Sequence, residues 1–467
     1  MKVIDMPDFE LPPLDAYIEP GLNPQSTKVK PEKSGKKKKD QDESPQFLFS
    51  RLLAKDGRYH AADGIIYEWI GTHWHALTGS QPERLALKWL FCVNPGKASD
   101  KLAASCASTA ALSLPDLPAR DSSITLIPCK SGTLEVTSES VKLRASAQRD
   151  GLTYCLECEY DPLAPRPIFD RFIVDALPNE SVRDWLQEFA GYTLISDTRH
   201  QIACWLLGRG GNGKGVFVEV LSALHARVAA SHIGAGDMTG FGMENLIGAS
   251  LVLVDETPQR IDEQRLKTLI SGDAIRIDRK YREPITLRSH AKWIVNGNSL
   301  PAISDQSDGF WRRLVVVRFD YQPATPTPLL GKLIVKSDLN GFLNWTIDGL
   351  QRLLRRGHFP VLPDALSAEK RKARLAANNV ANWLDECDVE ILDKPHDGPL
   401  AGMPKQTAYL SYSLWCKSSG TAPVSAFRFW ERVKTQHPGL REFRRGDGRG
   451  TSRVRCVNVF VPTPCDE

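Results

Sequence analysis

IACWLLGRGGNGKG, residues 202–215, joins an apolar run to a glycine-rich turn, and an amphipathic helical pattern with Phe217 and Leu221 follows. A strand, a glycine turn and a helix in this order are typical of a phosphate-binding loop. Glycines let consecutive main-chain N–H groups surround phosphate oxygens, and the helix N-terminus adds a positive dipole. The sequence therefore predicts a nucleotide site, with Lys214 on the β- and γ-phosphates, at Gly208, Gly210, Gly211, Asn212, Gly213, Lys214 and Gly215.

The residue after the lysine departs from the usual loop. Most such loops have Ser or Thr there, and the hydroxyl binds Mg²⁺. Gly215 has no hydroxyl, so the ion must take this ligand from water or from another residue. We expect the phosphate cradle to persist because it is built from the main chain. Weaker nucleotide binding is the alternative expectation for this position.

Two acidic residues end a second apolar run, SLVLVDE at residues 250–256. Buried strands of parallel sheets are continuously apolar, and ligands bind at their carboxyl ends. We therefore expect Asp255 to hold Mg²⁺ beside ATP and Glu256 to polarise the attacking water.

Two further elements follow at similar spacing. The run AKWIV at residues 291–295 leads into NGNSLP and predicts a strand next to the first two. We expect Asn298 to hold the lytic water or the γ-phosphate; a turn or cap is the alternative, since Asn-Gly marks turns. The segment GFWRRL at residues 309–314 offers Arg313 as an arginine that acts on the ATP of a neighbouring subunit. The alternative there is a solvated arginine pair.

The composition is that of a globular protein. With 467 residues, 42% hydrophobic and 25% charged, the chain is long enough for about two to four domains. No apolar run approaches the roughly 20 residues of a membrane helix, and the N-terminus has no apolar signal core, so we expect a cytoplasmic location without membrane contact. The net charge of +4 does not by itself indicate nucleic-acid binding. Cys155 and Cys158 form a CxxC without a second ligand pair nearby, so we expect reduced thiols and no zinc.

The expected fold class is α/β, with an AAA+-like P-loop ATPase core around a parallel sheet. A small β-rich module and a helical collar precede this core, and two helices followed by an arginine-rich hairpin predict a C-terminal winged-helix domain. The lysine-dense N-terminus is expected to be disordered, either as an arm for DNA or as a linker. The expected bounds are 1–45 for the arm, 46–165 for the β-rich module, 166–200 for the collar, 201–360 for the core and 365–467 for the winged-helix domain.

Together these motifs resemble the superfamily 3 helicases, specifically the phage and plasmid primase-helicase branch found in satellite phages, mobile elements and poxviruses. Residues 208–215 resemble motif A, Asp255 with Glu256 motif B, Asn298 motif C, and Arg313 the arginine segment that closes the core. Some members of the branch also have glycine after the motif A lysine. The resemblance implies a ring, usually of six subunits, that hydrolyses ATP at subunit interfaces and translocates on single-stranded DNA.

The same resemblance identifies a DNA-gripping hairpin between motifs B and C. Residues 266–282 carry basic side chains beside a tyrosine, which suits phosphates and bases without sequence readout. A solvated basic hairpin is the alternative. The expected contacts are Arg279, Lys280, Tyr281 and Arg282 with single-stranded DNA, and Arg444, Arg445, Arg449 and Arg453 of the C-terminal hairpin with duplex DNA.

Family members often have a primase domain upstream. Residues 46–165 lack the paired metal-binding carboxylates that a primase needs, so we expect no primer synthesis here and a separate primase or polymerase as a candidate partner. The leading interpretation is a replicative DNA helicase of a phage, plasmid or other mobile element. One alternative is a helicase loader or origin remodeller without processive unwinding. Another is a DNA-binding assembly factor whose ATPase is weak because Gly215 cannot bind Mg²⁺.

Overall fold

The computed structural model describes residues 43–121, 123–230, 240–255, 261–279, 282–301, 303, 305–392, 401–446 and 453–461. Of Arg282 only the main chain is described. Several expected features lie outside the described residues, namely the lysine-rich arm up to residue 42, Glu256, Lys280, Tyr281 and Arg449.

Residues 45–113 form a unit in which three helices pack against a small antiparallel sheet with β2 in its middle. The core between helices and sheet contains Phe49, Tyr59, Trp89 and Cys106. The elements are α1 (Pro45–Asp56), β1 (Tyr59–Ala62), β2 (Ile65–Trp69), β3 (Trp74–Ala76), α2 (Gln81–Val93) and α3 (Asp100–Ser113).

These helices correct the expectation that residues 46–165 are mainly β-structure. Ser99 accepts a hydrogen bond from the Leu102 nitrogen and so caps the start of α3. Proline in the first turn of α2 needs no hydrogen-bond partner for its nitrogen. The buried side chains of α2 recur at helical spacing, at Pro82, Ala86, Trp89 and Leu90. This spacing favours a helix.

A second antiparallel sheet lies within the segment expected to be a β-rich module, residues 46–165. Strand β5 pairs with both β4 and β6. Ile127 and Leu134 are fully buried and join the core that continues into the next segment. The strands are β4 (Thr125–Cys129), β5 (Gly132–Val136) and β6 (Val141–Arg144).

The helices expected in residues 166–200 are α4 (Pro167–Ala176) and α5 (Glu180–Thr193). Helix α5 packs along α10 (Leu339–Arg356), and a Cβ atom added to Gly191 would lie 2.5 Å from the Leu350 nitrogen. Only glycine permits so close an approach of two main chains. The apolar face of α5 is therefore buried within this chain.

The central sheet is parallel and has five strands in the order β13-β7-β12-β9-β8. Strand β12 lies between β7 and β9, so the prediction that the three motif-bearing strands are neighbours is confirmed. The strands are β7 (Ala203–Leu207), β8 (Val228–Ala230), β9 (Leu251–Val254), β12 (Lys292–Gly297) and β13 (Leu314–Arg318).

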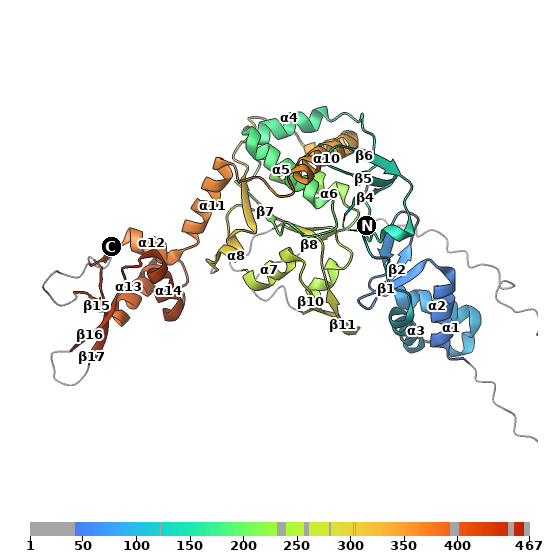
Figure 1. The fold of residues 1–467 in the computed structure, drawn as a ribbon, viewed down its shortest axis with the longest axis horizontal. Helices are drawn as coiled ribbons and strands as arrows, with labels where there is room; N and C mark the ends of the chain where they lie inside the picture. Colours follow the sequence, from blue (N-terminus) through green and yellow to red (C-terminus); the bar gives the residue numbers. More distant parts are fainter. Residues whose placement is uncertain are drawn as a thin grey trace, which may run out of the picture. The chain divides into compact units, whose positions relative to one another are not determined.

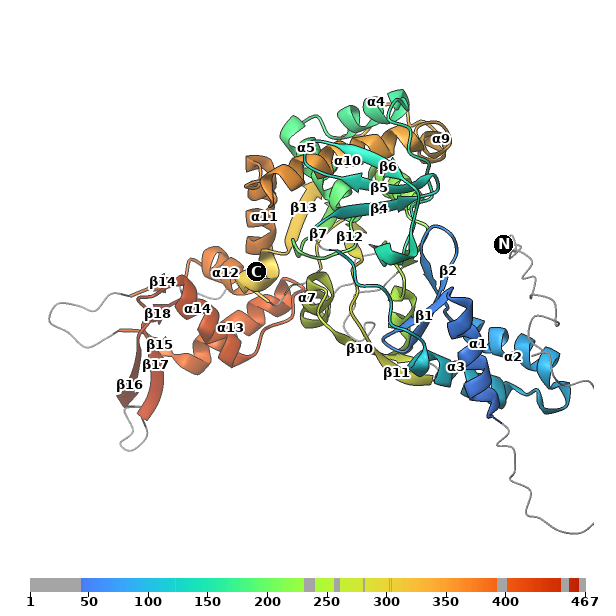
Figure 2. The same cartoon turned by 45° about the vertical axis from the view of Figure 1, so that its right-hand side comes forward.

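Helices cover both faces of this sheet, as Figure 1 and Figure 2 show. Along β7, Cys204 and Leu206 join the core with α5, α6 and α10, whereas Trp205 and Leu207 join the core with α7 and α8. This alternation follows from the two-residue period of a strand. Every residue of β7 is buried, as expected for an inner strand of a parallel sheet.

The remaining core elements surround the sheet. A hairpin of β10 and β11 follows α7, and α11 packs beside β13. The core therefore extends beyond residue 360, past the expected boundary, because α11 has apolar residues that β13 covers. The elements are α6 (Lys214–Leu224), α7 (Glu263–Ser271), β10 (Ile275–Arg279), β11 (Arg282–Leu287), α8 (Asp308–Trp311), α9 (Leu330–Ser337) and α11 (Asp364–Ala376).

The C-terminal residues have a core of their own around Trp383, Tyr412, Phe429 and Val433. Helices followed by an antiparallel strand pair occur here, in the order that the sequence predicts. The elements are α12 (Asn379–Glu386), β14 (Glu390–Ile391), β15 (Met403–Pro404), α13 (Lys405–Ser418), α14 (Ala426–Gln436), β16 (Glu442–Gly446), β17 (Arg453–Val457) and β18 (Val459–Phe460).

Candidate functional site

The glycine loop connects the carboxyl end of β7 to the first residue of α6. Its backbone needs glycine at three positions, since φ is +150° at Gly208, +76° at Gly211 and +92° at Gly213. A Cβ atom at Gly208 would lie 2.1 Å from the Phe319 oxygen, and one at Gly213 would lie 2.8 Å from the Phe172 ring. The loop is thus held against β13 on one side and α4 on the other.

The opposite side of the loop has space beside it among the residues that the structure describes. A Cβ atom added to Gly210, Gly211 or Gly215 would meet no described atom within 4 Å. These positions line a cavity of about 1340 Å³ that is also bordered by Asp255 and Asn298. Main-chain N–H groups and a helix N-terminus facing such a cavity form a site for an anion.

Lys214 lies within the loop and is 6% exposed. Its Nζ donates to the Gly208 oxygen at 2.5 Å, the Arg209 oxygen at 3.0 Å and Asn212 Oδ1 at 3.1 Å. Burial and the nearby Arg318 guanidinium lower the pKa of Lys214. Because all three acceptors belong to the loop, an anion in the cavity would compete with them for the same ammonium group.

Asn212 anchors the loop to the end of β13. Its Nδ2 donates to the Phe319 oxygen, while its Oδ1 accepts from Lys214. Gln322 adds a second connection, since its Nε2 donates to the Gly210 oxygen at 3.0 Å. Sequence reasoning missed both the Phe319 main chain and Gln322, because they follow β13, far from the loop in sequence.

Asp255 follows β9 and lines the same cavity. Its Oδ1 accepts a hydrogen bond of 2.9 Å from Asn296 Nδ2 at the end of β12. Asn298, which the sequence predicts as the polar amide of this site, is exposed and also lines the cavity. Asn296 was missed. The sequence signal for it is the strand pairing, since Val295 lies opposite Val254 and the next residues are Asn296 and Asp255.

A divalent cation fits these residues. Asn296 Oδ1 is buried and has no hydrogen-bond partner among the residues that the structure describes. Such an orphaned oxygen beside a carboxylate matches the oxygen ligands that Mg²⁺ prefers. Asp255 and Asn296 are therefore the candidate protein ligands, directly or through water, in place of the hydroxyl that Gly215 lacks.

Arg313 immediately precedes β13, whereas the glycine loop follows β7. The two strands are parallel, with Leu314 opposite Ala203, so Arg313 lies at the amino edge of the sheet and the loop at the carboxyl edge. A five-residue strand spans about 16 Å. The structure therefore does not bring Arg313 to the nucleotide loop of its own chain.

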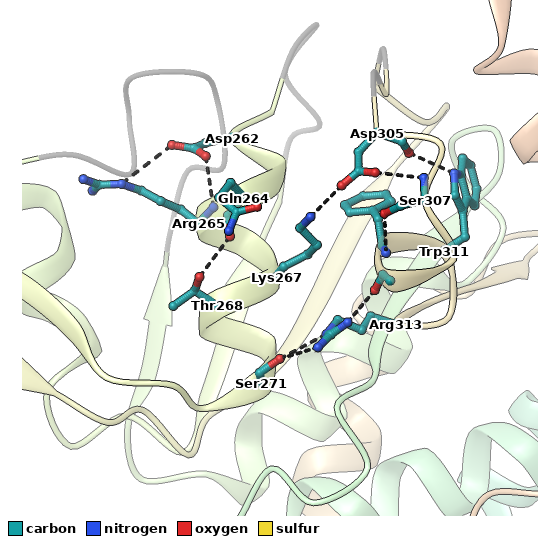
Figure 3. Close-up of polar contacts among 12 residues, drawn as sticks. Asp262, Gln264, Arg265, Lys267, Thr268, Ser271, Asp305, Ser307, Trp311 and Arg313 are labelled. Atoms are coloured by element: carbon teal, nitrogen blue, oxygen red, sulfur yellow. Dashed lines mark hydrogen bonds and ion pairs between the residues drawn. The ribbon is translucent and has the colours of Figure 1, made fainter. Parts of the chain in front are cut away.

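Figure 3 shows how Arg313 is held. Its Nε and Nη2 donate to Ser271 Oγ at 3.1 and 2.8 Å, and its Nη1 donates to the Gly309 oxygen at 2.5 Å. Gln201 Oε1 accepts from Arg313 Nη2 at 3.0 Å and from the exposed neighbour Arg312 at 2.9 Å. Arg312 and Arg313 thus lie together at the amino edge of the sheet, and Arg313 makes more of these hydrogen bonds than Arg312 does.

A second set of contacts in Figure 3 joins α7 to the segment before Arg313. Lys267 Nζ lies 2.7 Å from Asp305 Oδ2, and Trp311 Nε1 donates to the Asp305 oxygen at 3.0 Å. Burial raises the pKa of Asp305, but hydrogen bonds from Lys267 and Ser307 outweigh it, and the net pKa is lowered. Helix α7 and the arginine segment are therefore joined at both ends.

The expected DNA-binding residues that the structure describes lie on two antiparallel strand pairs. In the first, Arg279 pairs with Arg282 at the tip side of the β10–β11 ladder. In the second, Arg444, Arg445 and Arg453 are exposed on β16 and β17.

Searches for other site types within the described ranges give negative results. No helix there is long and apolar enough for a membrane crossing. No cluster of three or more His, Cys, Asp or Glu side chains suited to a metal ion occurs there either. Cys155 and Cys158 are both buried free thiols, and burial raises the pKa of each.

The fold and site thus define an α/β protein with a candidate anion and cation site at the carboxyl edge of a parallel sheet. Two segments match known families. Residues 46–178 match the family described as D5 N terminal like. Residues 206–313, which contain the glycine loop through Arg313, match DUF5906, a family of unknown function.

Individual proteins are also similar. The "Putative helicase L207/L206" of Acanthamoeba polyphaga mimivirus is 27% identical over 160 residues, which are 32% of this chain and 16% of that protein. This chain thus spans a small part of the viral relative. The D5 N terminal like match and this relative together support a D5-like primase-helicase relationship.

Three solved structures of the NrS-1 C terminal region are also similar. They have 13%, 12% and 14% sequence identity and TM-scores of 0.46, 0.45 and 0.44. They cover 89%, 89% and 90% of this chain, and 99%, 99% and 100% of their own chains.

Proposed function

We propose that this chain is an ATP-dependent DNA helicase of the superfamily 3 type that acts in replication as a ring, with six subunits as the expected number. The observation that carries the proposal is the distribution of charge over the sheet. Lys214, Asp255 and Asn296 lie at the carboxyl edge, and Arg313 lies at the opposite edge. The similarity to a viral protein named as a putative helicase also supports a helicase function.

Each residue of the loop edge has a distinct task in this proposal. Loop N–H groups and Lys214 bind the triphosphate of ATP, and the Lys214 ammonium exchanges its loop carbonyls for phosphate oxygens. Asp255 and Asn296 hold Mg²⁺, which offsets charge on the phosphates. Glu256, outside the described residues, activates the attacking water, and Asn298 positions it. Gly215 leaves the ion without a loop hydroxyl, so water completes its ligands.

The second edge acts on a neighbouring subunit. An arginine that reaches the γ-phosphate from outside stabilises the charge of the transferring group, and such fingers are worth about 10³–10⁵ in rate where measured. Arg313 cannot serve the loop of its own chain, because the length of the sheet separates them. Hydrolysis therefore depends on assembly of like subunits.

DNA contacts are assigned to the two hairpins. Lys280 and Tyr281 follow β10, and α7 directly precedes that strand. Movement of α7 together with the arginine segment would displace the β10–β11 hairpin and any DNA strand bound to it. The C-terminal part is proposed as a winged-helix domain that contacts duplex DNA through Arg444, Arg445 and Arg453.

The deciding experiment measures ATP hydrolysis and unwinding of a forked duplex by the purified chain. We expect hydrolysis that rises with single-stranded DNA and disappears in Lys214→Ala. Lys280→Ala should keep basal hydrolysis but lose strand separation. Hydrolysis without unwinding by the unaltered protein would favour a loader or origin remodeller. Absence of DNA-stimulated hydrolysis would favour the assembly factor that Gly215 allows.

A further inference from the structure

A groove of about 880 Å³ lies between α13, α14 and the β16–β17 strands, within the C-terminal residues. This volume is in the roughly 300–1,000 Å³ range of sites that enclose a small ligand. The functions assigned above use the arginines of the hairpin but not the groove beside them. Its lining combines aromatic and apolar side chains with three basic and two acidic ones, namely Lys405, Lys434, Arg455, Glu431 and Glu442.

One face of α14 supplies the aromatic part. Phe427, Trp430 and Lys434 line the groove at helical spacing, whereas Phe429 and Val433 fill the domain core. Phe427 is 73% exposed, although phenylalanine is costly to leave in water.

Two further apolar side chains extend the same surface. Leu410 of α13 is 53% exposed and Val454 of β17 is 38% exposed, and both line the groove. A cluster of exposed apolar side chains with a charged rim marks an interaction site.

The strands supply the positive charge. Arg444 and Arg455 lie directly opposite each other in the β16–β17 ladder, and Gly446 lies opposite Arg453. Like charges in a cross-strand pair repel, so this face of the hairpin gains stability when an anion binds. Glu442 on the same face forms an ion pair with Lys405, so the charges of these two side chains offset each other and Arg444 and Arg455 keep theirs.

Lys405 connects the basic and aromatic parts. Its ammonium nitrogen lies 5.0 Å from the centroid of the Trp430 ring. A cation over an aromatic face is a favourable arrangement, and it places the ion pair of Lys405 and Glu442 at the edge of a flat apolar surface. This combination suits a ligand with flat rings joined by negative groups.

We propose that this groove binds unpaired nucleotides of single-stranded nucleic acid, with one base stacked on Phe427 or Trp430. Phosphates on either side of that base contact Arg455 and Lys434. Duplex nucleic acid does not satisfy the aromatic residues, because its base faces are covered by neighbouring base pairs. A peptide seldom offers a flat ring at each residue, whereas every nucleotide carries a base that can stack on these aromatic side chains. The inference extends the DNA-binding part of the proposed function and is independent of ATP hydrolysis.

Site-specific photocrosslinking tests the location. The full-length chain, without nucleotide, is mixed with a 20-residue oligothymidylate that carries a single 5-iododeoxyuridine, and crosslinked peptides are identified by mass spectrometry. We expect crosslinks to Phe427 or Trp430. Lys214→Ala should give the same crosslinks, so failure of the ATPase proposal leaves this result unchanged. Crosslinks confined to other parts of the chain would overturn the inference.

Binding measurements test the chemistry. Phe427→Ala should weaken binding of the oligothymidylate about tenfold, since stacking on one aromatic residue contributes at that level. The same variant should leave binding of an abasic oligonucleotide of equal length unchanged, because phosphates remain but bases do not. Leu414→Ala is the matched control, since Leu414 is 64% exposed on α13 but outside the groove lining. The proposal would be contradicted if Phe427→Ala weakened binding of both oligonucleotides equally or of neither. It would also be contradicted if the groove bound duplex more tightly than single-stranded DNA.

Discussion

Arg313 donates two hydrogen bonds to the single hydroxyl of Ser271, from Nε at 3.1 Å and from Nη2 at 2.8 Å. Ser271 is the last residue of α7, and Gly272 after it has φ of +72° and leads into β10. The proposed arginine finger is therefore fastened to the helix that carries the proposed DNA hairpin. In the proposed function, this contact would transmit movement of either element to the other.

Loss of that contact should uncouple the arginine from α7. In Ser271→Ala we expect kcat for ATP hydrolysis to fall about tenfold with little change in KM, because a loosely held guanidinium reaches the transition state less often. Thr268→Ala is the control, since Thr268 lies one turn earlier on α7 and its hydroxyl bonds to the Gln264 oxygen. Steady-state kinetics that show equal effects of the two substitutions would argue against a special role for Ser271.

A hydroxyl at position 215 should improve Mg²⁺ use. A Cβ atom there meets nothing within 4 Å among the described atoms, so Gly215→Ser fits without displacing a neighbour. We expect the Mg²⁺ concentration for half-maximal hydrolysis to fall by about three- to tenfold, because serine supplies the ligand that most such loops use. Gly215→Ala adds the carbon without the hydroxyl and should lack this effect. If alanine and serine shift the Mg²⁺ dependence alike, the site does not use a loop ligand.

Asn296 should matter to the ion more than Asn298 does. Asn296→Ala removes the donor to Asp255 and the unpaired oxygen beside it, so we expect a several-fold higher Mg²⁺ requirement. Asn298→Ala should lower kcat with an unchanged Mg²⁺ requirement, because that exposed amide is assigned to the water. Titration of hydrolysis with Mg²⁺ separates the two outcomes. A reversed pattern would make Asn298, and not Asn296, the amide that assists Asp255 with the ion.

Stability should fall in mild acid. Burial lowers the pKa of His225 to about 3 and that of His73 to about 4, from an ordinary value of 6.5. Between pH 6.5 and about 4 the unfolded chain binds protons that the folded chain does not, so the free energy of unfolding decreases as pH falls through this window. Each unit of pKa difference corresponds to about 1.4 kcal/mol at full titration.

Urea unfolding midpoints at pH 7.5, 6.0 and 4.5 measure this dependence. His225→Gln should flatten it, since His225 is enclosed by Thr193 and Ser250. His358→Gln at an exposed position should not. A midpoint that rises toward pH 4.5 would contradict the burial of neutral histidines.

Local pattern was sufficient to predict the loop, the buried strands and their adjacency. The loop at residues 208–215 has backbone angles that favour glycine, so the glycines in the sequence indicate the loop conformation. Asp255 could be placed at the carboxyl edge for the same reason, since it ends an apolar run. Helices α2 and α3 were not predicted, although their apolar spacing is regular. The aromatic strands that precede them favoured a prediction of β-structure for the whole segment.

Other features depend on contacts between distant segments. Asn296 lies beside Asp255 because β12 pairs with β9, and this pairing joins segments that are distant in sequence. The anchoring of Asn212 to Phe319, of Gln322 to the loop and of Arg313 to Ser271 joins residues whose separation in sequence carries no local signal. The packing of α11 on β13 likewise moved the end of the core beyond the expected boundary.

Mixing of two inactive variants tests the central claim most directly. Lys214→Ala lacks the phosphate-binding ammonium and Arg313→Ala lacks the finger, so each alone should hydrolyse ATP at no more than about 10⁻³ of the normal rate. In an equal mixture that exchanges subunits, roughly a quarter of interfaces combine an intact Lys214 with an intact Arg313 of the next subunit. We predict that hydrolysis returns to about that fraction of the unaltered rate. A mixture no more active than its separate components, or full activity of Arg313→Ala alone, would contradict a nucleotide site shared between subunits.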